Sequence, residues 1–322
     1  MSVDELTAFI PIAIEPVGRR TVVRWIERPR TASPLPFFSQ VARELVVSGA
    51  RQRVTPIEAL LATEGRGPAG IVLHVSRCGS TLVMQSLAAA ECVASVSEPT
   101  PVSQLLLRGN IPDADRVLML SGLMRALVPQ VGAAVDVPTL VKLTSWNVLF
   151  LDVIRAALPD TPWVFLYRDP LEVMASHAHR TPRWLSDDAF LTTFARLHRA
   201  PHPSGLSGAQ RSAMMWGAFG AAALRENPGP TSLLDYDQLP NALSADVPAR
   251  FRIRAGEAQR ARIVEASRFY SKGSARATIF DRGAERLARP VSQAMREADA
   301  QYSRAVYAEL DVRRGGVATA SG

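Results

Sequence analysis

Short, mainly apolar runs alternate with longer segments of helical character over most of this chain. Four such runs, at residues 71–75 (IVLHV), 139–143, 163–167 (WVFLY) and 231–235, predict strands. Helices are predicted beside them at residues 82–90, 147–158 and 210–226, and in the segment after Pro170. Because short buried strands alternate with helices, the pattern predicts an α/β fold with a parallel sheet flanked by helices.

The N-terminal part of the chain has a different pattern. Residues 21–27 (TVVRWIE) alternate as a strand does, and residues 37–47 predict a short helix after a proline-rich break. A Gly- and Pro-rich connector at residues 63–70 then leads into the first strand of the predicted sheet. Residues 1–69 are therefore expected to form an extension or cap of unknown function.

The C-terminal part predicts one long helix over residues 284–310, followed by a polar tail at residues 311–322 that is expected to be disordered. The expected organisation is thus the extension at residues 1–69, an α/β domain at residues 70–310, and the tail.

Composition narrows the class of protein. Of the 322 residues, 47% are hydrophobic and 21% are charged, as in an ordinary globular protein. No apolar run reaches the roughly 18 residues of a membrane span. Asp4 and Glu5 precede any basic residue, unlike a secretory signal, so the protein is expected to be soluble and cytoplasmic. Two cysteines, Cys78 and Cys92, are too few for a disulfide framework, and their spacing is not that of a zinc site.

The net charge of +7 favours an anionic ligand. Nucleic acid is one class of such ligands, but lysine is scarce beside arginine and no long basic run is present. We therefore expect a polyanionic small molecule and no nucleic acid.

Candidate site residues follow the predicted strands directly. Residues 77–81 come after the first strand, Lys142 lies at the end of the second, and Arg168 follows the third. Ligands of parallel α/β sheets bind beyond the carboxyl ends of the strands. We expect the site there.

The first of these loops has the composition of an anion cradle. Gly79 allows close approach of the backbone, and Ser80 and Thr81 add hydroxyl donors at the start of a helix, where free N–H groups and the helix dipole favour negative charge. The Gly-Lys-Ser/Thr ending of a Walker A loop is missing, which argues against a Mg²⁺–nucleoside triphosphate. An ordinary strand-to-helix turn is the alternative.

Residues 76–82 (SRCGSTL) resemble the 5′-phosphosulfate-binding loop of sulfotransferases that use 3′-phosphoadenosine 5′-phosphosulfate (PAPS). The form with arginine is similar to tyrosylprotein-type and many bacterial members. The resemblance implies a P-loop-like fold in which the loop holds the 5′-phosphate of PAPS and of its product PAP. The loop residues implied in this role are Arg77, Cys78, Gly79, Ser80 and Thr81. Cys78 stands where serine is more usual.

Residues 164–176 (VFLYRDPLEVMAS) resemble the second phosphate-binding element of the family, in which a serine follows the arginine by eight positions. The resemblance implies that Arg168 and Ser176 bind the 3′-phosphate. A guanidinium fork suits a phosphate group, and a helical hydroxyl can reach the same group. The alternative is a structural arginine paired with Asp169.

Four further residues are assigned by the same resemblance. Lys142 corresponds to the basic residue that contacts the transferring sulfuryl group, and Glu98, in Ser-Glu-Pro, to the catalytic base of the tyrosylprotein type. Tyr236 resembles the tyrosine of an element near the nucleotide. Lys272, in Tyr-Ser-Lys-Gly, resembles a residue that closes over the 3′-phosphate, with a solvated turn lysine as the alternative.

The sequence thus predicts a sulfotransferase that moves a sulfuryl group from PAPS to a hydroxyl or amine. Glu98 removes the proton, Arg77 and Lys142 stabilise charge, and no metal is expected. His74 and His177 are lesser candidates for the base, with packed or structural roles as the alternative. A P-loop small-molecule kinase or a non-catalytic nucleotide-binding protein remains open. The oligomeric state also remains open, and so does the acceptor, which can be a small molecule, a peptide or a glycan.

Overall fold

The computed structural model describes residues 6–29, 35–129, 137–198, 203–269 and 290–315. The chain divides into two compact units. Unit 1 comprises Met1–Leu73, Ser80–Val164 and Leu239–Ile279, and unit 2 comprises His74–Gly79, Phe165–Gln238 and Phe280–Gly322. Lys272, the predicted residue over the 3′-phosphate, lies outside the described residues. The three-part organisation expected from the sequence stays a prediction.

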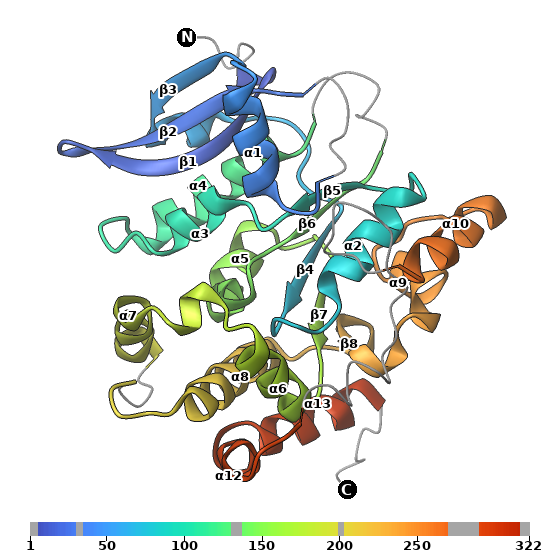
Figure 1. Cartoon of the computed structure of the whole chain (residues 1–322). Helices are drawn as coiled ribbons and strands as arrows, with labels where there is room; N and C mark the ends of the chain where they lie inside the picture. Colours follow the sequence, from blue (N-terminus) through green and yellow to red (C-terminus); the bar gives the residue numbers. More distant parts are fainter. Residues whose placement is uncertain (1–5, 30–34, 130–136, 199–202, 270–289, 316–322) are drawn as a thin grey trace, which may run out of the picture. The chain divides into compact units, whose positions relative to one another are not determined.

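The main sheet has five strands in the order β5-β6-β4-β7-β8 (Figure 1). The strands are β4 (Gly70–His74), β5 (Ala94–Ser97), β6 (Thr139–Lys142), β7 (Trp163–Tyr167) and β8 (Leu233–Asp235). The pairs β4–β6, β5–β6 and β7–β8 are parallel. The predicted α/β fold, a parallel sheet flanked by helices, is confirmed.

Strand β6 is the middle strand of the three that belong to unit 1. Its last residue, Lys142, is paired with Val72 of β4 on one side and with Ser97 of β5 on the other. All four residues of β6 are buried, as expected for a parallel strand with both neighbours in place. The helices of unit 1 include α2 (Ser80–Ala89), α3 (Thr100–Leu106), α4 (Asp113–Leu127), α5 (Leu151–Ala157), α9 (Asp246–Arg250) and α10 (Glu257–Ser267).

The N-terminal part of unit 1 is an antiparallel sheet in which β2 (Arg20–Glu27) lies between β1 (Phe9–Val17) and β3 (Gln52–Pro56) (Figure 1). The strand predicted at residues 21–27 is β2, and the predicted helix is α1 (Phe38–Val47). The sequence pattern did not predict β1, because Pro11 and Pro16 interrupt it. An edge strand such as β1 accommodates proline, since one side of it forms no ladder.

This antiparallel sheet packs on α3 and α4 of the same unit. The backbone N–H of Ile14 in β1 donates to Oε1 of Gln104 in α3 at 2.7 Å. Arg28, just after β2, donates to the carbonyls of Ala126 at 2.5 Å and Val128 at 3.2 Å, at the C-terminal end of α4. Burial lowers the pKa of Arg28 to about 10, so its charge is kept at neutral pH and can stabilise the helix terminus.

Unit 2 contains β7, β8 and helices that pack around α8 (Figure 1). Its helices include α6 (Pro170–His179), α7 (Asp188–His198), α8 (Gly208–Arg225), α12 (Gln293–Tyr302) and α13 (Arg304–Gly315). Helix α8 contacts α6, α12 and α13. Asp169 caps α6 by accepting a hydrogen bond from the backbone N–H of Leu171 at 2.8 Å, with Pro170 in the first turn.

The prediction of a single helix over residues 284–310 is wrong for the part of it that the structure describes, residues 290–310. Helix α12 ends at Tyr302, and α13 begins at Arg304. Ser303, between them, has φ −128°, and its hydroxyl donates to Oδ1 of Asp299 at 2.6 Å. A side chain that bonds one turn back competes with the helical backbone, and neither glycine nor proline marks the break in the sequence.

Helix α13 also extends further than the sequence predicted. It continues to Gly315, so residues 311–315, which were expected in a disordered tail, are helical. Arg314 donates to the hydroxyl of Tyr167 at 2.9 Å and pairs with Asp311 at 3.1 Å. The contact with Tyr167 joins the last turns of the helix to β7.

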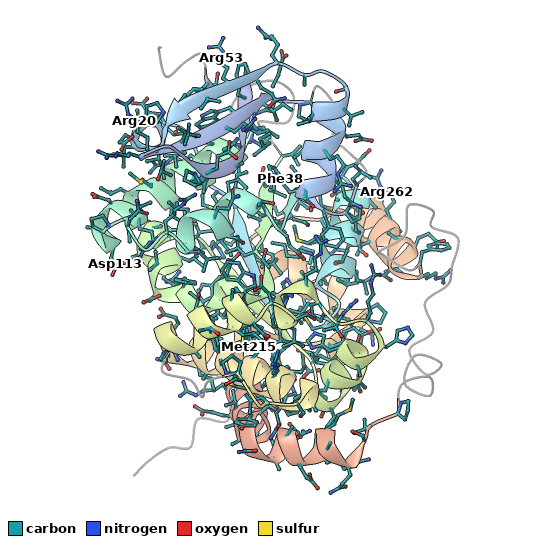
Figure 2. The ribbon with its side chains drawn as sticks, turned by 60° about the vertical axis from the view of Figure 1, so that its left-hand side comes forward. Arg20, Phe38, Arg53, Asp113, Met215 and Arg262 are labelled. Carbon is teal, nitrogen blue, oxygen red and sulfur yellow. The ribbon has the colours of Figure 1, made fainter. Side chains whose placement is uncertain are left out.

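Side chains divide between core and surface as the hydrophobic pattern requires. Phe38 at the start of α1 and Met215 in α8 are buried, whereas Arg20, Asp113 and Arg262 are exposed (Figure 2). Among the helices of the described ranges, none is long and apolar enough to span a membrane.

Two glycines of α8 offer a matched test of its packing. A Cβ at Gly217 would lie 2.0 Å from the carbonyl oxygen of Tyr302, whereas a Cβ at Gly208 would meet nothing within 4 Å. We expect Gly217→Ala to lower the free energy of unfolding by about 1 to 3 kcal/mol. Gly208→Ala should raise it by up to about 1 kcal/mol through helix propensity. Urea denaturation measures both, and similar effects at the two positions would contradict this packing.

Candidate active site

The loop between β4 and α2 has an uncommon backbone conformation. Ser76 and Arg77 have φ values of 72° and 53°, and Gly79 has φ 82°. Positive φ costs a non-glycine residue of order 1 kcal/mol or more, and such residues concentrate at functional sites. Loops of this kind can direct several backbone N–H groups toward an anion. The backbone is thus suited to the predicted phosphate cradle, although phosphate binding itself stays a prediction.

The side chain of Cys78 is directed into the protein. It is fully buried, and its thiol donates to the carbonyl of Leu166 in β7 at 3.2 Å. A serine in the usual position would offer a hydroxyl, but here the side chain is committed to the core. Any contribution of Cys78 to a bound anion would therefore come from its backbone N–H.

Two histidines form hydrogen bonds with Ser76, the residue of the loop with φ 72°. The backbone N–H of Ser76 donates to Nδ1 of His74 at 3.0 Å. The Nε2 atom of His177 lies 3.4 Å from the Ser76 hydroxyl, and its Nδ1 atom lies 2.7 Å from the hydroxyl of Ser212 in α8. Both histidines are buried. These contacts favour the structural interpretation of His74 and His177 over a role as the base.

Arg77, the second residue of the loop, reaches toward the end of α6. Its Nη2 atom donates to the carbonyl of Arg180 at 2.7 Å. Arg77 belongs to unit 2 and Glu98 to unit 1, so their expected roles in one reaction stay a prediction.

Lys142 lies at the centre of a polar group in unit 1. Its side chain has no solvent exposure, and its Nζ atom lies 2.8 Å from Oε1 of Glu98 and 3.4 Å from the hydroxyl of Thr81 at the start of α2. The ring of Phe37, which precedes α1, lies 4.9 Å from the same Nζ atom. A buried ammonium group requires such partners, because an unpaired buried charge is very unfavourable.

The backbone holds Glu98 in place beside Lys142. Glu98 directly follows β5 and has φ 57°, and its N–H donates to the Lys142 carbonyl at 2.6 Å. Pro99 is then the N-cap of α3, so the chain turns directly after Glu98. The Glu98 side chain remains 30% exposed, which leaves the carboxylate accessible to a ligand.

Arg168 is held on three sides within unit 2. Its Nε atom pairs with Oε2 of Glu172 at 2.6 Å, and its Nη1 atom donates to the Arg77 carbonyl at 3.1 Å. Its guanidinium carbon lies 4.2 Å from the centre of the Tyr236 ring. The structure thus brings the Arg168 side chain against the Arg77 backbone and the Tyr236 ring, and a shared role of the three in binding a nucleotide stays a prediction.

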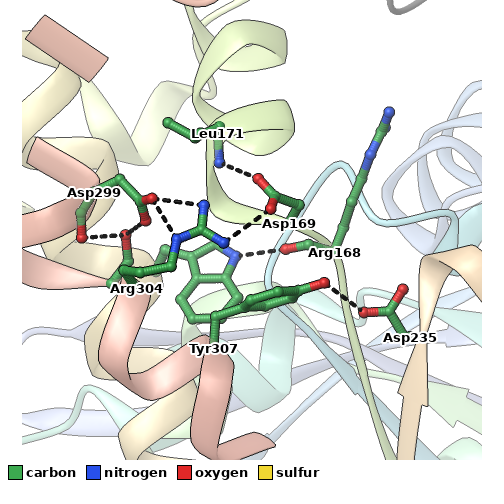
Figure 3. A network of polar contacts seen from close by, with 9 residues as sticks. Arg168, Asp169, Leu171, Asp235, Asp299, Arg304 and Tyr307 are labelled. Carbon is green, nitrogen blue, oxygen red and sulfur yellow. Dashed lines mark hydrogen bonds and ion pairs between the residues drawn. The ribbon is translucent and has the colours of Figure 1, made fainter. Parts of the chain in front are cut away.

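Asp169 was the expected partner of Arg168 if that arginine were purely structural. Asp169 instead caps α6 and pairs through Oδ2 with Nη1 of Arg304 at 3.1 Å (Figure 3). The carboxylate beside Arg168 is Glu172, one helical turn into α6. Ser176 is buried one further turn along the helix, on the face that carries Glu172. Its binding of a 3′-phosphate stays a prediction.

Three contacts of the site were missed from the sequence. Glu172 lies four residues after Arg168, a spacing that can reveal a pair on a helix. Phe37 and Arg304 had no local signal, because their partners Lys142 and Asp169 are more than a hundred residues away in the sequence. Among the described residues, no group of three or more His, Cys, Asp or Glu side chains is arranged to hold a metal ion.

Comparisons with known proteins give a structural similarity and no match in sequence. No family model matches the chain, and a search of curated proteins finds no match. Among solved structures, the chain is similar to the sulfotransferase domain from the curacin biosynthetic pathway, with 12% identity and a TM-score of 0.42. The similarity covers 74% of this chain and 99% of that one. At this TM-score it adds nothing to what the residues themselves support.

The Lys142–Glu98 pair can be tested by its effect on stability. We expect Glu98→Gln to lower the free energy of unfolding by about 1 to 3 kcal/mol, because the buried ammonium then faces a neutral amide. The effect should shrink in a Lys142→Met background, and the difference measures the coupling between the two charges.

Glu91→Gln is the matched control for this experiment. Glu91 also has a positive φ, 56°, but it pairs with Arg262 at the surface, where its side chain is 78% exposed. We expect a change within about 0.5 kcal/mol, measured by urea denaturation. If Glu98→Gln costs no more than Glu91→Gln, the pair does not stabilise the fold.

Proposed function

We propose that this protein is a PAPS-dependent sulfotransferase that transfers a sulfuryl group to a hydroxyl or amine of its acceptor. The observation that carries the proposal is the contact of Lys142 with both Glu98 and Thr81. By the resemblance, Lys142 contacts the sulfuryl group, Glu98 removes the proton and Thr81 binds the 5′-phosphate. In unit 1 the three side chains meet at one ammonium group.

The proposed reaction is an in-line displacement at sulfur. The acceptor oxygen or nitrogen forms a bond to sulfur while the bond from sulfur to the 5′-phosphate oxygen breaks, and that oxygen keeps the electron pair. Lys142 stabilises the charge that develops on the sulfuryl and leaving oxygens, which a buried ammonium does more effectively than one in water. Arg77 adds positive charge from the loop, as the resemblance implies.

Glu98 is the proposed general base, because its carboxylate is partly exposed and fixed by the backbone. A proton from the acceptor would pass to this carboxylate as the new bond to sulfur forms. The pair with Lys142 fixes the position of the carboxylate directly after β5. On transfer of a proton to Glu98, the ammonium of Lys142 would be released from the pair to the sulfuryl group.

The nucleotide is proposed to bind through two groups of residues. The amides of residues 77–79 with Ser80 and Thr81 suit the 5′-phosphate, and Arg168 with Ser176 suits the 3′-phosphate. Tyr236 holds the Arg168 guanidinium by a cation–π contact. The proposed reaction requires no metal, and we propose that the protein is cytoplasmic. The proposed acceptor is a small molecule, a peptide or a glycan.

A nucleotide screen tests this proposal without knowledge of the acceptor. PAP without Mg²⁺ should stabilise the protein by about 2.7 kcal/mol at a hundred times its dissociation constant, and ADP and AMP much less. Arg168→Ala should weaken PAP by about 1.5 to 3 kcal/mol and leave AMP nearly unchanged, because only PAP carries a 3′-phosphate. Thermal shift and calorimetry measure both. Equal stabilisation by Mg²⁺–ATP would instead indicate a kinase, and no response to any nucleotide would rule out both enzymes.

Hydrolysis of PAPS to PAP and sulfate tests the base, since water replaces the unknown acceptor. We expect Glu98→Gln to slow this reaction by about 10² to 10⁴, with PAP affinity close to that of the wild type. The assay is run at a temperature where the variant is folded by circular dichroism, with Glu91→Gln as the control. A rate near that of the wild type would remove Glu98 from the mechanism, and loss of PAP binding would make it a structural partner of Lys142.

A further inference from the structure

Each member of the Arg168–Tyr236 pair has an aspartate as its neighbour in the chain. Asp169 directly follows Arg168, and Asp235 directly precedes Tyr236. The guanidinium and the ring lie 4.2 Å apart, so a small displacement of either backbone segment would separate them. The contacts of the two aspartates therefore control the geometry of the pair.

Arg304, the first residue of α13, holds the first aspartate. Its Nη1 atom contacts Oδ2 of Asp169 at 3.1 Å, while its Nε and Nη2 atoms contact Oδ2 of Asp299 at 2.7 and 2.6 Å (Figure 3). Burial alone would lower the pKa of Arg304, but hydrogen bonds and charge from Asp169 and Asp299 raise it above its ordinary value. The guanidinium is thus a permanent, planar bridge between α12 and the residue after Arg168.

Tyr307 holds the second aspartate. Its hydroxyl donates to Oδ2 of Asp235 at 3.3 Å (Figure 3). Oδ1 of Asp235 accepts from the N–H of Asp237 at 2.6 Å. Burial raises the pKa of Tyr307, and the nearby aspartates raise it further, so the hydroxyl stays a donor. Its ring lies edge to face against Trp216 at 5.9 Å, and Trp216 donates its indole N–H to the Arg168 carbonyl at 3.1 Å.

Arg304 and Tyr307 are three residues apart and share one face of α13. One helical turn thus contacts the residue after Arg168 and the residue before Tyr236. We infer that Arg304 and Tyr307 are positioning residues that set the Arg168–Tyr236 geometry and, through it, the selectivity for a nucleotide with a 3′-phosphate. This inference rests on the proposed function. It gives the C-terminal helix a role in ligand selection, although α13 is far in the sequence from both elements that carry the pair.

Binding measurements by calorimetry with PAP and AMP test this inference. Tyr307→Phe, which keeps the ring and removes only the hydroxyl, should raise the dissociation constant for PAP about threefold to tenfold. Arg304→Met should raise it about tenfold or more, and Arg304→Lys should fall between wild type and Arg304→Met, because an ammonium cannot bridge two carboxylates with a planar fork. The dissociation constant for AMP should stay within about twofold in each variant.

Arg313→Met is the matched control on the same helix. Arg313 bonds Asn227 at 2.6 Å and Glu309 at 3.5 Å, and this substitution should leave the affinities for both nucleotides unchanged. Equal weakening of PAP and AMP, or no effect of Tyr307→Phe on PAP, would overturn the inference, even if Arg304→Met fails to fold. A wild-type protein that does not prefer PAP to AMP would overturn the proposed function instead, so the two failures are distinguishable.

Discussion

The buried ammonium group of Lys142 needs polar and oppositely charged partners inside the protein. Much of the candidate site in unit 1 follows from that requirement. Lys142 ends a strand that is flanked on both sides, and its side chain has no solvent exposure. The fold supplies a carboxylate, a hydroxyl and an aromatic face from Glu98, Thr81 and Phe37. Such a group is unfavourable to bury unless it is paired and hydrogen-bonded. The three partners supply that compensation.

Backbone strain occurs directly after two of the strands. Ser76 and Arg77 follow β4, and Glu98 follows β5, all with left-handed φ values. The sheet fixes where each strand ends, and hydrogen bonds such as that from Glu98 N–H to the Lys142 carbonyl hold the residues that follow. The stability of the sheet and helices thus offsets the cost of presenting these residues in uncommon conformations.

The sequence predicted the elements whose signals are local. The apolar run of β7 was identified with its observed bounds, and the helix predicted at residues 82–90 corresponds to α2, which begins two residues earlier at Ser80. The partner of Arg168 was not identified, because Asp169 and Glu172 both lie nearby in sequence and only the direction of α6 decides between them.

Other features could not be predicted because they depend on tertiary contacts. Phe37 reaches Lys142 from the N-terminal part of the chain, and the break at Ser303 depends on how Asp299 and Arg304 pair. Strand β1 is stable with two prolines because β2 covers only one of its edges. The partner of Phe37 is more than a hundred residues away, whereas Ser303 and β1 depend on a side-chain contact and on an edge position that hydrophobic periodicity does not register.

The inward direction of Cys78 has a practical consequence. Its thiol is enclosed beneath the loop between β4 and α2. The other cysteine, Cys92, is also buried, and burial raises its pKa, which keeps its reactive thiolate scarce. An alkylating reagent added to the native protein can therefore reach either thiol only when the structure around it opens. The rate of Cys78 alkylation reports the opening of that loop, and a bound anion that tightens the loop would slow it. The chain thus carries a chemical probe of the loop between β4 and α2 without any engineered label.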